Sequence, residues 1–198
     1  MNEQFWDNRY RSSDQVFSGN PNGVLVTEVA DLPPGQALDV GCGEGADALW
    51  LASRGWRVTA ADISKVALQR AAAADVAGSV AWTRADLTVE PPPAAAFDLV
   101  SMHYFPLPQQ RNHTGLRGLL DAVASGGTLL VGSHDLTDLP PHHERGFDPD
   151  DYYRPDDIVR LLDDSWTVLV NETRSRTAPA PAGTHHLHDI VLRAQRTR

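Results

Sequence analysis

Residues 38–47 constrain the fold of this chain more than any other part of the sequence. They read Leu-Asp-Val-Gly-Cys-Gly-Glu-Gly-Ala-Asp, so an acid, Asp39, stands two residues before three alternating glycines. A strand-like apolar run precedes the glycines, and a helix-like run follows them. Glycines at this spacing let backbone N–H groups approach a ligand that side chains would hold away. The segment therefore predicts a strand–loop–helix unit that binds a cofactor.

A second acid, Asp62, ends the strand-like segment Arg57–Asp62. It lies about 20 residues after the glycines, which is the offset at which an acid meets a ribose diol. A carboxylate can accept both hydroxyl protons in charge-assisted hydrogen bonds. The alternative role for Asp62 is a helix cap, but Ser64 is the better N-cap of the helical run that follows. The glycines and Asp62 together predict a nucleoside cofactor.

The D-x-G-x-G-x-G order of residues 39–45 resembles motif I of the class I S-adenosylmethionine (SAM)-dependent methyltransferases. An acid at Asp39 suits the cationic methionine amine of SAM better than it suits a pyrophosphate. Gly41, Gly43 and Ala46 also fit the G-x-G-x-x-A pattern of dinucleotide-binding proteins, so an NAD-dependent oxidoreductase is an alternative. The only lysine, Lys65, does not complete the Tyr-x-x-x-Lys pair of short-chain dehydrogenases.

Composition narrows the class of protein. The 198 residues suit one domain, and the net charge of -9 argues against a nucleic acid substrate. A single cysteine, Cys42, excludes an intrachain disulfide. No apolar run approaches the ~20 residues that a membrane span requires, and the first residues lack an apolar signal core. We therefore expect a cytoplasmic protein that acts on a small molecule away from membranes, whereas its oligomeric state leaves no trace in the sequence.

Strand and helix signals alternate along the chain, which predicts a parallel sheet with right-handed crossovers. The strand-like segments are 36–40, 57–62, 80–84, 97–102 and 128–133. The helical segments are 2–11, 24–30, 46–54, 64–77, 110–124 and 155–163. Two longer strands, 166–177 and 185–195, are separated by a Pro/Ala stretch too short for a parallel crossover, so they should pair antiparallel.

The methyltransferase resemblance extends over nearly the whole chain, from Phe5 to about Arg196. It implies a single domain over 1–198 with an α/β, Rossmann-like three-layer sandwich. Its seven-stranded, mostly parallel sheet would have the order 3-2-1-4-5-7-6 and an antiparallel C-terminal hairpin. Residues 5–10 and 17–22 look like the lead-in of small bacterial methyltransferases of the tellurite-resistance and thiopurine type. This likeness implies an N-terminal lid, residues 1–22, and the long loop 134–154 is interpreted as an insertion.

The resemblance also implies roles for individual residues. Trp6 and Tyr10, four residues apart on one helical face, would cover the cofactor, unless they only staple that helix to the body. Asp86 would accept a hydrogen bond from the adenine amino group, although an Asx turn is an alternative role. The full set of expected cofactor-binding residues is Trp6, Tyr10, Asp39, Gly41, Cys42, Gly43, Asp62, Ile63, Asp86, Leu87 and His103.

The acceptor side is less defined by sequence. His134 follows the fifth strand beside the expected substrate mouth and is the candidate base or orienting residue. Phe17, Tyr104, Phe105, Tyr152 and Tyr153 could line an apolar acceptor pocket, although loop packing is the commoner fate of such residues. Five further histidines are interpreted as solvated surface residues: His142, His143, His185, His186 and His188. Adjacent histidines point apart, so we expect no metal site.

The sequence thus predicts an enzyme that transfers a methyl group from SAM to a small-molecule acceptor, leaving S-adenosylhomocysteine. The acceptor atom, sulfur, oxygen or nitrogen, stays open, because a base is needed only where the acceptor is protonated. A nonenzymatic SAM-binding or regulatory protein is the alternative from another class.

Overall fold

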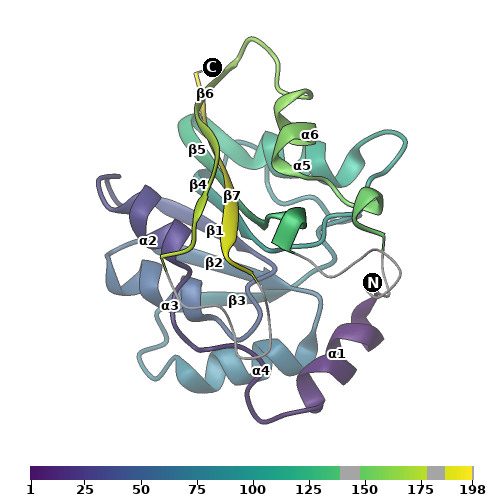
Figure 1. Cartoon of the computed structure of the whole chain (residues 1–198). Coiled ribbons are helices and arrows are strands. Elements are labelled where there is room, and N and C mark those ends of the chain that lie inside the picture. The colour runs from purple at the N-terminus through teal and green to yellow at the C-terminus, as the bar shows by residue number, and fades with distance from the viewer. Residues whose placement is uncertain (139–147, 178–185, 198) are drawn as a thin grey trace.

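Seven strands form one sheet with the order β3-β2-β1-β4-β5-β7-β6 (Figure 1). The computed structural model describes residues 1–138, 148–177 and 186–197. Strands β1 to β5 run parallel to one another, whereas β7 is antiparallel to both β5 and β6. The predicted Rossmann-like sheet with its antiparallel hairpin is therefore confirmed.

The elements follow the predicted alternation. The strands are β1 Gln36–Val40, β2 Arg57–Asp62, β3 Val80–Arg84, β4 Phe97–His103, β5 Val123–His134, β6 Trp166–Ser175 and β7 His188–Arg196. The α-helices are α1 Glu3–Arg11, α2 Gly23–Val29, α3 Ala46–Ser53, α4 Lys65–Ala74, α5 Thr114–Ala122 and α6 Pro155–Val159. Two short 3-10 helices, η1 Leu136–Asp138 and η3 Pro149–Asp151, lie in the long loop, of which residues 139–147 are outside the described residues.

Local sequence explains where several helices begin. Asn2 caps α1 by accepting a hydrogen bond from the backbone N–H of Phe5, and Ser64 caps α4 in the same way. Gly45 stands before α3 with a φ of 87°, in the left-handed region. A Cβ on Gly45 would lie 2.5 Å from the ring of Trp82, so both conformation and packing require glycine here. The glycine loop thereby fixes the start of α3 against β3.

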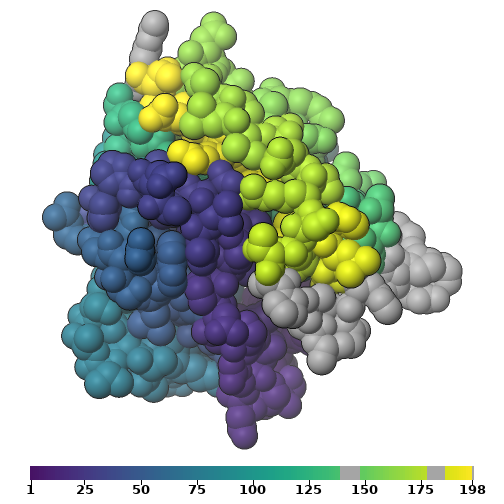
Figure 2. Space-filling view, turned by 60° about the vertical axis from the view of Figure 1, so that its left-hand side comes forward, coloured from purple at the N-terminus to yellow at the C-terminus, as the bar shows by residue number. Residues whose placement is uncertain are grey.

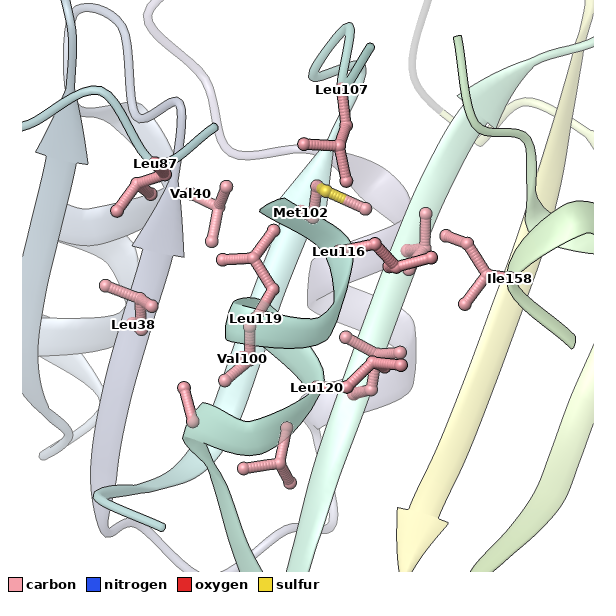
Figure 3. Close-up of a cluster of buried hydrophobic side chains, with 14 of the residues drawn as sticks. Leu38, Val40, Leu87, Val100, Met102, Leu107, Leu116, Leu119, Leu120 and Ile158 are labelled. Atoms are coloured by element: carbon pink, nitrogen blue, oxygen red, sulfur yellow. The ribbon is translucent and has the colours of Figure 1, made fainter. Parts of the chain in front are cut away.

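Each face of the sheet carries its own hydrophobic core. Figure 3 shows one of them, where leucines of α5, among them Leu116 and Leu119, point toward Val100 and Met102 of β4. The opposite face packs α2 and α3 against alternating residues, such as Leu99 of β4. Because side chains alternate along a strand, the polar residues Ser101 and His103, two and four positions after Leu99, also face α3. This alternation places a polar site beside α3.

Some predicted boundaries were wrong. We expected a helix over 110–124, but α5 ends at Ala122, and the glycine pair Gly126 and Gly127, which is a helix-stop signal, lies inside β5. The pairing of β4 with β5 shifts register between Phe97 and Leu99, and Gly126 has a φ of 79°. The glycine pair thus accompanies an irregularity within a strand. The C-terminal hairpin is also trimmed, because β6 ends at Ser175 and β7 begins at His188.

Candidate active site at the carboxyl edge of the sheet

A pocket opens where β1, β2, β3 and β4 end, at the edge where open α/β sheets bind ligands. It is lined by residues from the glycine loop, from the turns after β2 and β3, from α1 and from the segment after β4. The predicted residues among them are Trp6, Gly41, Asp62, Ile63, Asp86, Leu87 and Phe105. The tertiary structure therefore gathers most of the expected cofactor residues in one place.

Asp62 organises the glycine loop from within the pocket. Its Oδ2 accepts a hydrogen bond from the backbone N–H of Gly43 at 2.9 Å, and its Oδ1 accepts one from Ser64 at 2.8 Å. Burial raises the pKa of Asp62, although these backbone hydrogen bonds oppose the shift. Ser64 is the N-cap of α4, as predicted, but Asp62 also has a structural role. Its carboxylate both lines the pocket and holds the loop.

Asp39 is buried in β1 with only 3% of its surface exposed. Its Oδ2 has no hydrogen-bond partner among the described residues. Burial raises its pKa well above the usual range, and the carboxylates of Asp47 and Asp62 add to the shift. A buried acceptor without a donor is costly, by about 1–3 kcal/mol. Such an atom is a natural partner for a cationic ligand group.

His103, the last residue of β4, lies on the same face of the sheet as Asp39. Ser101 is the register partner of Asp39, and His103 stands two residues further along β4. Its Nδ1 lies 3.0 Å from Ser101 Oγ and 3.4 Å from an oxygen of Asp47, whereas its buried Nε2 has no partner among the described residues. Burial lowers the pKa of His103, while Asp47 and Asp189 act in the opposite direction. The imidazole is held by one nitrogen and presents the other.

Asp86 uses part of its carboxylate locally. Its Oδ1 accepts hydrogen bonds from the backbone N–H of Thr88 at 3.0 Å and from its hydroxyl at 2.6 Å. This is the Asx turn that was the alternative role for Asp86. The residue also lines the pocket together with Ile63 and Leu87, so the Asx turn does not remove Asp86 from the pocket.

The aromatic residues of the N-terminal segment cover the glycine loop. Tyr10 is 3% exposed, and its hydroxyl would lie 2.7 Å from a Cβ on Gly43. The Trp6 and Tyr10 rings are 6.4 Å apart, and Phe17 packs edge-on against Tyr10 at 6.2 Å although it is half exposed. In Figure 2 the purple N-terminal residues lie against the body of the domain.

Three acids that sequence reasoning did not single out hold this segment in place. Asp7 accepts hydrogen bonds from the hydroxyl of Ser64 and from the backbone of Val66 at the start of α4. Glu44 of the glycine loop accepts hydrogen bonds from the backbone N–H groups of Val16 and Phe17. Arg70 adds an ion pair to Glu44 at 2.9 Å, and Asp47 binds Asn22. Of these three acids, only Asp47 had a signal in the local sequence, because an acid in the first turn of a helix is favoured by the helix dipole.

A second polar group lies beyond β4 on the side of β5 and β7. Tyr104 donates a hydrogen bond to Asp189 at 2.8 Å, and the Arg176 guanidinium donates to both. His134 stacks on Tyr104 at 4.2 Å and on His186 at 3.8 Å. Burial, with the nearby His186 and Arg176, lowers the pKa of His134 to about 3. The imidazole of His134 is therefore neutral and a weak base.

Of the remaining residues predicted to bind the acceptor, some line the pocket and others do not. Phe105 lines the pocket and would touch a Cβ on Gly41. Tyr153 is buried in the core, and its hydroxyl is 2.5 Å from Nδ1 of His113, whereas Tyr152 forms an isolated bridge with Pro108. The structure thus places Tyr153 in packing rather than at the pocket. His142, His143 and His185 are outside the described residues.

Cys42 lies inside the glycine loop. Burial raises the pKa of its thiol well above the usual value, and Asp39 and Asp62 contribute to the shift. Since the thiolate is the reactive form, this environment suits a small structural residue. Within the described ranges, no three His, Cys, Asp or Glu side chains group as metal ligands would. The helices in those ranges also include none with the length and apolar character that crossing a membrane requires.

Both the family comparison and the comparison with curated sequences find similarity to methyltransferases. The family model of a methyltransferase domain matches residues 37–127. An uncharacterized methyltransferase of Mycobacterium tuberculosis is 34% identical over 123 residues, which are 60% of this chain and 60% of that protein. Ajmaline N-methyltransferase of Rauvolfia serpentina is 30% identical over 171 residues, which are 80% of this chain and 56% of the relative. The chain thus spans between 56% and 60% of the length of these relatives.

Solved structures share the fold over almost the full chain. The N-methyltransferase NodS from Bradyrhizobium japonicum WM9, in complex with S-adenosylhomocysteine, superposes with a TM-score of 0.74 at 17% identity. That match covers 99% of this chain and 98% of NodS. A structure concerned with conversion of a disulfide bond into a thioacetal group during echinomycin biosynthesis gives 0.77 at 23% identity, covering 98% and 91%.

Proposed function

We propose that this chain is a class I SAM-dependent methyltransferase and that it methylates a small molecule with SAM bound in the pocket at the carboxyl edge. The acceptor atom, sulfur, oxygen or nitrogen, is not fixed by these likenesses. The resemblance to enzymes of the tellurite-resistance and thiopurine type stays a prediction, as does a cytoplasmic location.

One observation carries the cofactor part of the proposal. Asp39 Oδ2 and His103 Nε2 are both buried, both without a partner among the described residues, and both on the α3 face of the sheet. The methionine part of SAM carries an ammonium and a carboxylate. Asp39 would hold the ammonium, and His103 would donate to the carboxylate while Asp47 and Ser101 hold its Nδ1. The opposite pKa shifts of the two residues fit this pairing, since a zwitterion would charge both.

The rest of the pocket suits a nucleoside. Asp62 would accept the ribose hydroxyls and Asp86 the adenine amino group, between the apolar side chains of Ile63 and Leu87. Trp6 lines the same pocket and presents an aromatic face for a sulfonium, worth roughly 0.5–2 kcal/mol. The carboxylate of Asp39 suits the cationic methionine amine of SAM better than the pyrophosphate of NAD, so it favours SAM as the cofactor.

The protein's contribution to the transfer is chiefly alignment and exclusion of water. Bound SAM supplies an activated methyl group on a sulfonium, so the chain must hold the acceptor in line with it. The N-terminal segment covers the glycine loop and would shield the reacting centre from water. His134, with a pKa of about 3, suits an orienting role as a neutral hydrogen-bonding group more than that of a strong base.

The test has two stages. Calorimetry should show that the purified protein binds SAM and S-adenosylhomocysteine but not NAD, and Asp39→Asn should weaken SAM binding while the exposed control Asp31→Asn does not. Binding of NAD instead of SAM would contradict the proposal. Release of S-adenosylhomocysteine is then measured over thiols, phenols and N-heterocycles. SAM binding without turnover of any acceptor would favour the nonenzymatic alternative.

A further inference from the structure

Arg176 follows β6 and is fixed in place by its neighbours at the end of the sheet. Its backbone N–H donates to Leu187 at 2.9 Å. Its Nη1 donates to Asp189 at 2.8 Å and to the Tyr104 hydroxyl at 2.9 Å, and the guanidinium lies 5.3 Å from the centre of the Tyr104 ring. Only 11% of the side chain is exposed. The orientation of the guanidinium is therefore set by the fold.

The Nε–H donor of this guanidinium points to a missing acceptor. Arg176 Nε is buried and has no hydrogen-bond partner among the described residues. An arginine can only donate, so the missing partner must be an acceptor. Native proteins rarely leave a buried donor unmet, because the cost is about 1–3 kcal/mol, and exceptions often mark functional positions. The Nδ1 atom of His134, in the same side-chain group, is likewise buried without a partner.

Charge decides which kind of acceptor fits. The positive charge of Arg176 is already matched by Asp189 at 2.8 Å, and Asp138 lies nearby on His188 at 3.1 Å. The whole chain carries a net charge of -9. A carboxylate brought to Nε would therefore meet a surplus of negative charge. An uncharged oxygen, such as a carbonyl, takes the hydrogen bond without this repulsion.

Ring geometry narrows the shape of the molecule. Tyr104 and His134 stack with an interplanar angle of 21°, and His134 and His186 with one of 14°. Tyr104 itself has a φ of 53°, a conformation that non-glycine residues rarely adopt and that is often found at functional sites. The neighbouring residue, Phe105, lines the cofactor pocket. The group thus includes Tyr104, the sequence neighbour of a residue that lines the candidate cofactor pocket, and it offers planar surfaces.

We propose that Arg176 Nε recognises a carbonyl oxygen of an uncharged, planar methyl acceptor placed beside Tyr104 and His134. This inference rests on the proposed function and adds the chemical class of the acceptor. Lactam or imide heterocycles and hydroxylated aryl ketones belong to this class, whereas aliphatic thiols and aromatic carboxylates do not. Because Nε is buried, the acceptor must displace neighbouring side chains to reach it, which makes the Nε–H signal of Arg176 a direct readout.

The experiment compares matched ligands on the protein loaded with S-adenosylhomocysteine. Oxindole is compared with indoline, and 4-hydroxyacetophenone with 4-ethylphenol, so that each pair differs in a carbonyl. The carbonyl member should bind about tenfold or more tightly, the scale of a hydrogen bond to a charged group. 4-Hydroxybenzoate, which adds a negative charge, should bind more weakly than 4-hydroxyacetophenone. Equal binding within each pair, or preference for the carboxylate, overturns the proposal.

A variant pair assigns the effect to the residue. Arg176→Lys keeps the charge but removes the Nε–H, so it should abolish the preference for the carbonyl ligand and remove one arginine Nε–H signal that shifts on ligand addition. Arg174→Lys, two residues earlier and paired with Glu28, is the matched control and should change neither. If Arg176→Lys does not fold, the wild-type comparison of ligand pairs still decides.

Different results would contradict the proposed function and the assignment of the acceptor. Wild-type protein that does not bind S-adenosylhomocysteine contradicts the proposed function. Protein that binds it, yet shows no carbonyl preference and no shift of the Arg176 Nε–H signal, contradicts only the assignment of the acceptor.

Discussion

The carboxylate of Asp47 holds Asn22 by two hydrogen bonds, one from its backbone N–H at 2.7 Å and one from its side-chain amide at 2.8 Å. The same carboxylate lies 3.4 Å from His103. It therefore joins the end of the N-terminal segment, the first turn of α3 and the end of β4. Residues 1–22 are thus anchored to the body of the domain, and Asp7 and Tyr10 of this segment are buried.

Loosening the Asn22 anchor should free the N-terminal segment. Asn22→Ala removes one of the two hydrogen bonds to Asp47, so amide exchange over residues 12–22 should become severalfold faster in the unliganded protein. Asn20→Ala, at an exposed position two residues earlier, is the control. S-adenosylhomocysteine should slow exchange over residues 1–22 in the wild type. Indifference of this segment to the ligand would contradict its role as a lid.

Gly43 tests the cover over the glycine loop. A Cβ at this position would lie 2.7 Å from the Tyr10 hydroxyl, and the φ of 53° disfavours a side chain. Gly43→Val should therefore displace Tyr10 and abolish SAM binding measured by calorimetry. Gly78→Ala has a similar φ of 61° but nothing within 4 Å of the new Cβ, so it controls for backbone strain alone. Normal SAM binding by Gly43→Val would show that this loop is not the cradle.

Asp62 should matter both for binding and for stability. Asp62→Ala should weaken SAM binding by roughly 1.5–3 kcal/mol, the scale of hydrogen bonds to a charged group. Because the carboxylate also accepts hydrogen bonds from Gly43 and Ser64, the unliganded variant should lose about 1–3 kcal/mol of unfolding free energy. Asp62→Asn, which retains one acceptor oxygen, should lose less stability. Unchanged SAM affinity in folded Asp62→Ala would contradict the ribose assignment.

Asp39 links cofactor binding to pH. Its raised pKa means that the folded protein holds this proton more tightly than the unfolded chain does, so its contribution to stability is favourable at low pH. That contribution is lost as the pH rises from about 3.9, the unfolded value, through the folded pKa. Asp39→Asn should therefore raise the melting temperature of the unliganded protein at pH 8 and weaken SAM binding.

Calorimetry of the wild type in buffers of different ionisation enthalpy should show proton exchange on SAM binding. This exchange should differ in Asp39→Asn, because that variant has no carboxyl proton to release. If the unliganded Asp39→Asn protein melts below the wild type at pH 8, burial of a disfavoured charge at Asp39 is the wrong explanation.

Much of the fold could be predicted from the sequence because its signals are local. The glycines after Val40, the capping residue Ser64 and the apolar alternation of β1 and β4 act over a few residues. The boundary errors, at the end of α5 and within β5, occurred where strand pairing with Phe97 overrides the helix-stop signal of two glycines. The candidate cofactor residues near β1, β2 and β3 could be proposed for the same reason, since each lies at or just after the end of a strand.

The sequence by itself determined the sheet order expected from the resemblance, the glycine loop, and the two acids that line the pocket, Asp62 at the end of β2 and Asp86 after β3. Only the tertiary structure decided which groups close the site and which are left without partners. Tyr104 and Asp189 are 85 residues apart and Val16 and Glu44 are 28 apart, yet each pair is hydrogen-bonded. The physical reason is that hydrophobic periodicity and turn residues predict only the local backbone conformation. Whether a donor such as Arg176 Nε lacks a partner depends on its burial, which is set by segments distant in the sequence, and only a buried donor without a partner is costly.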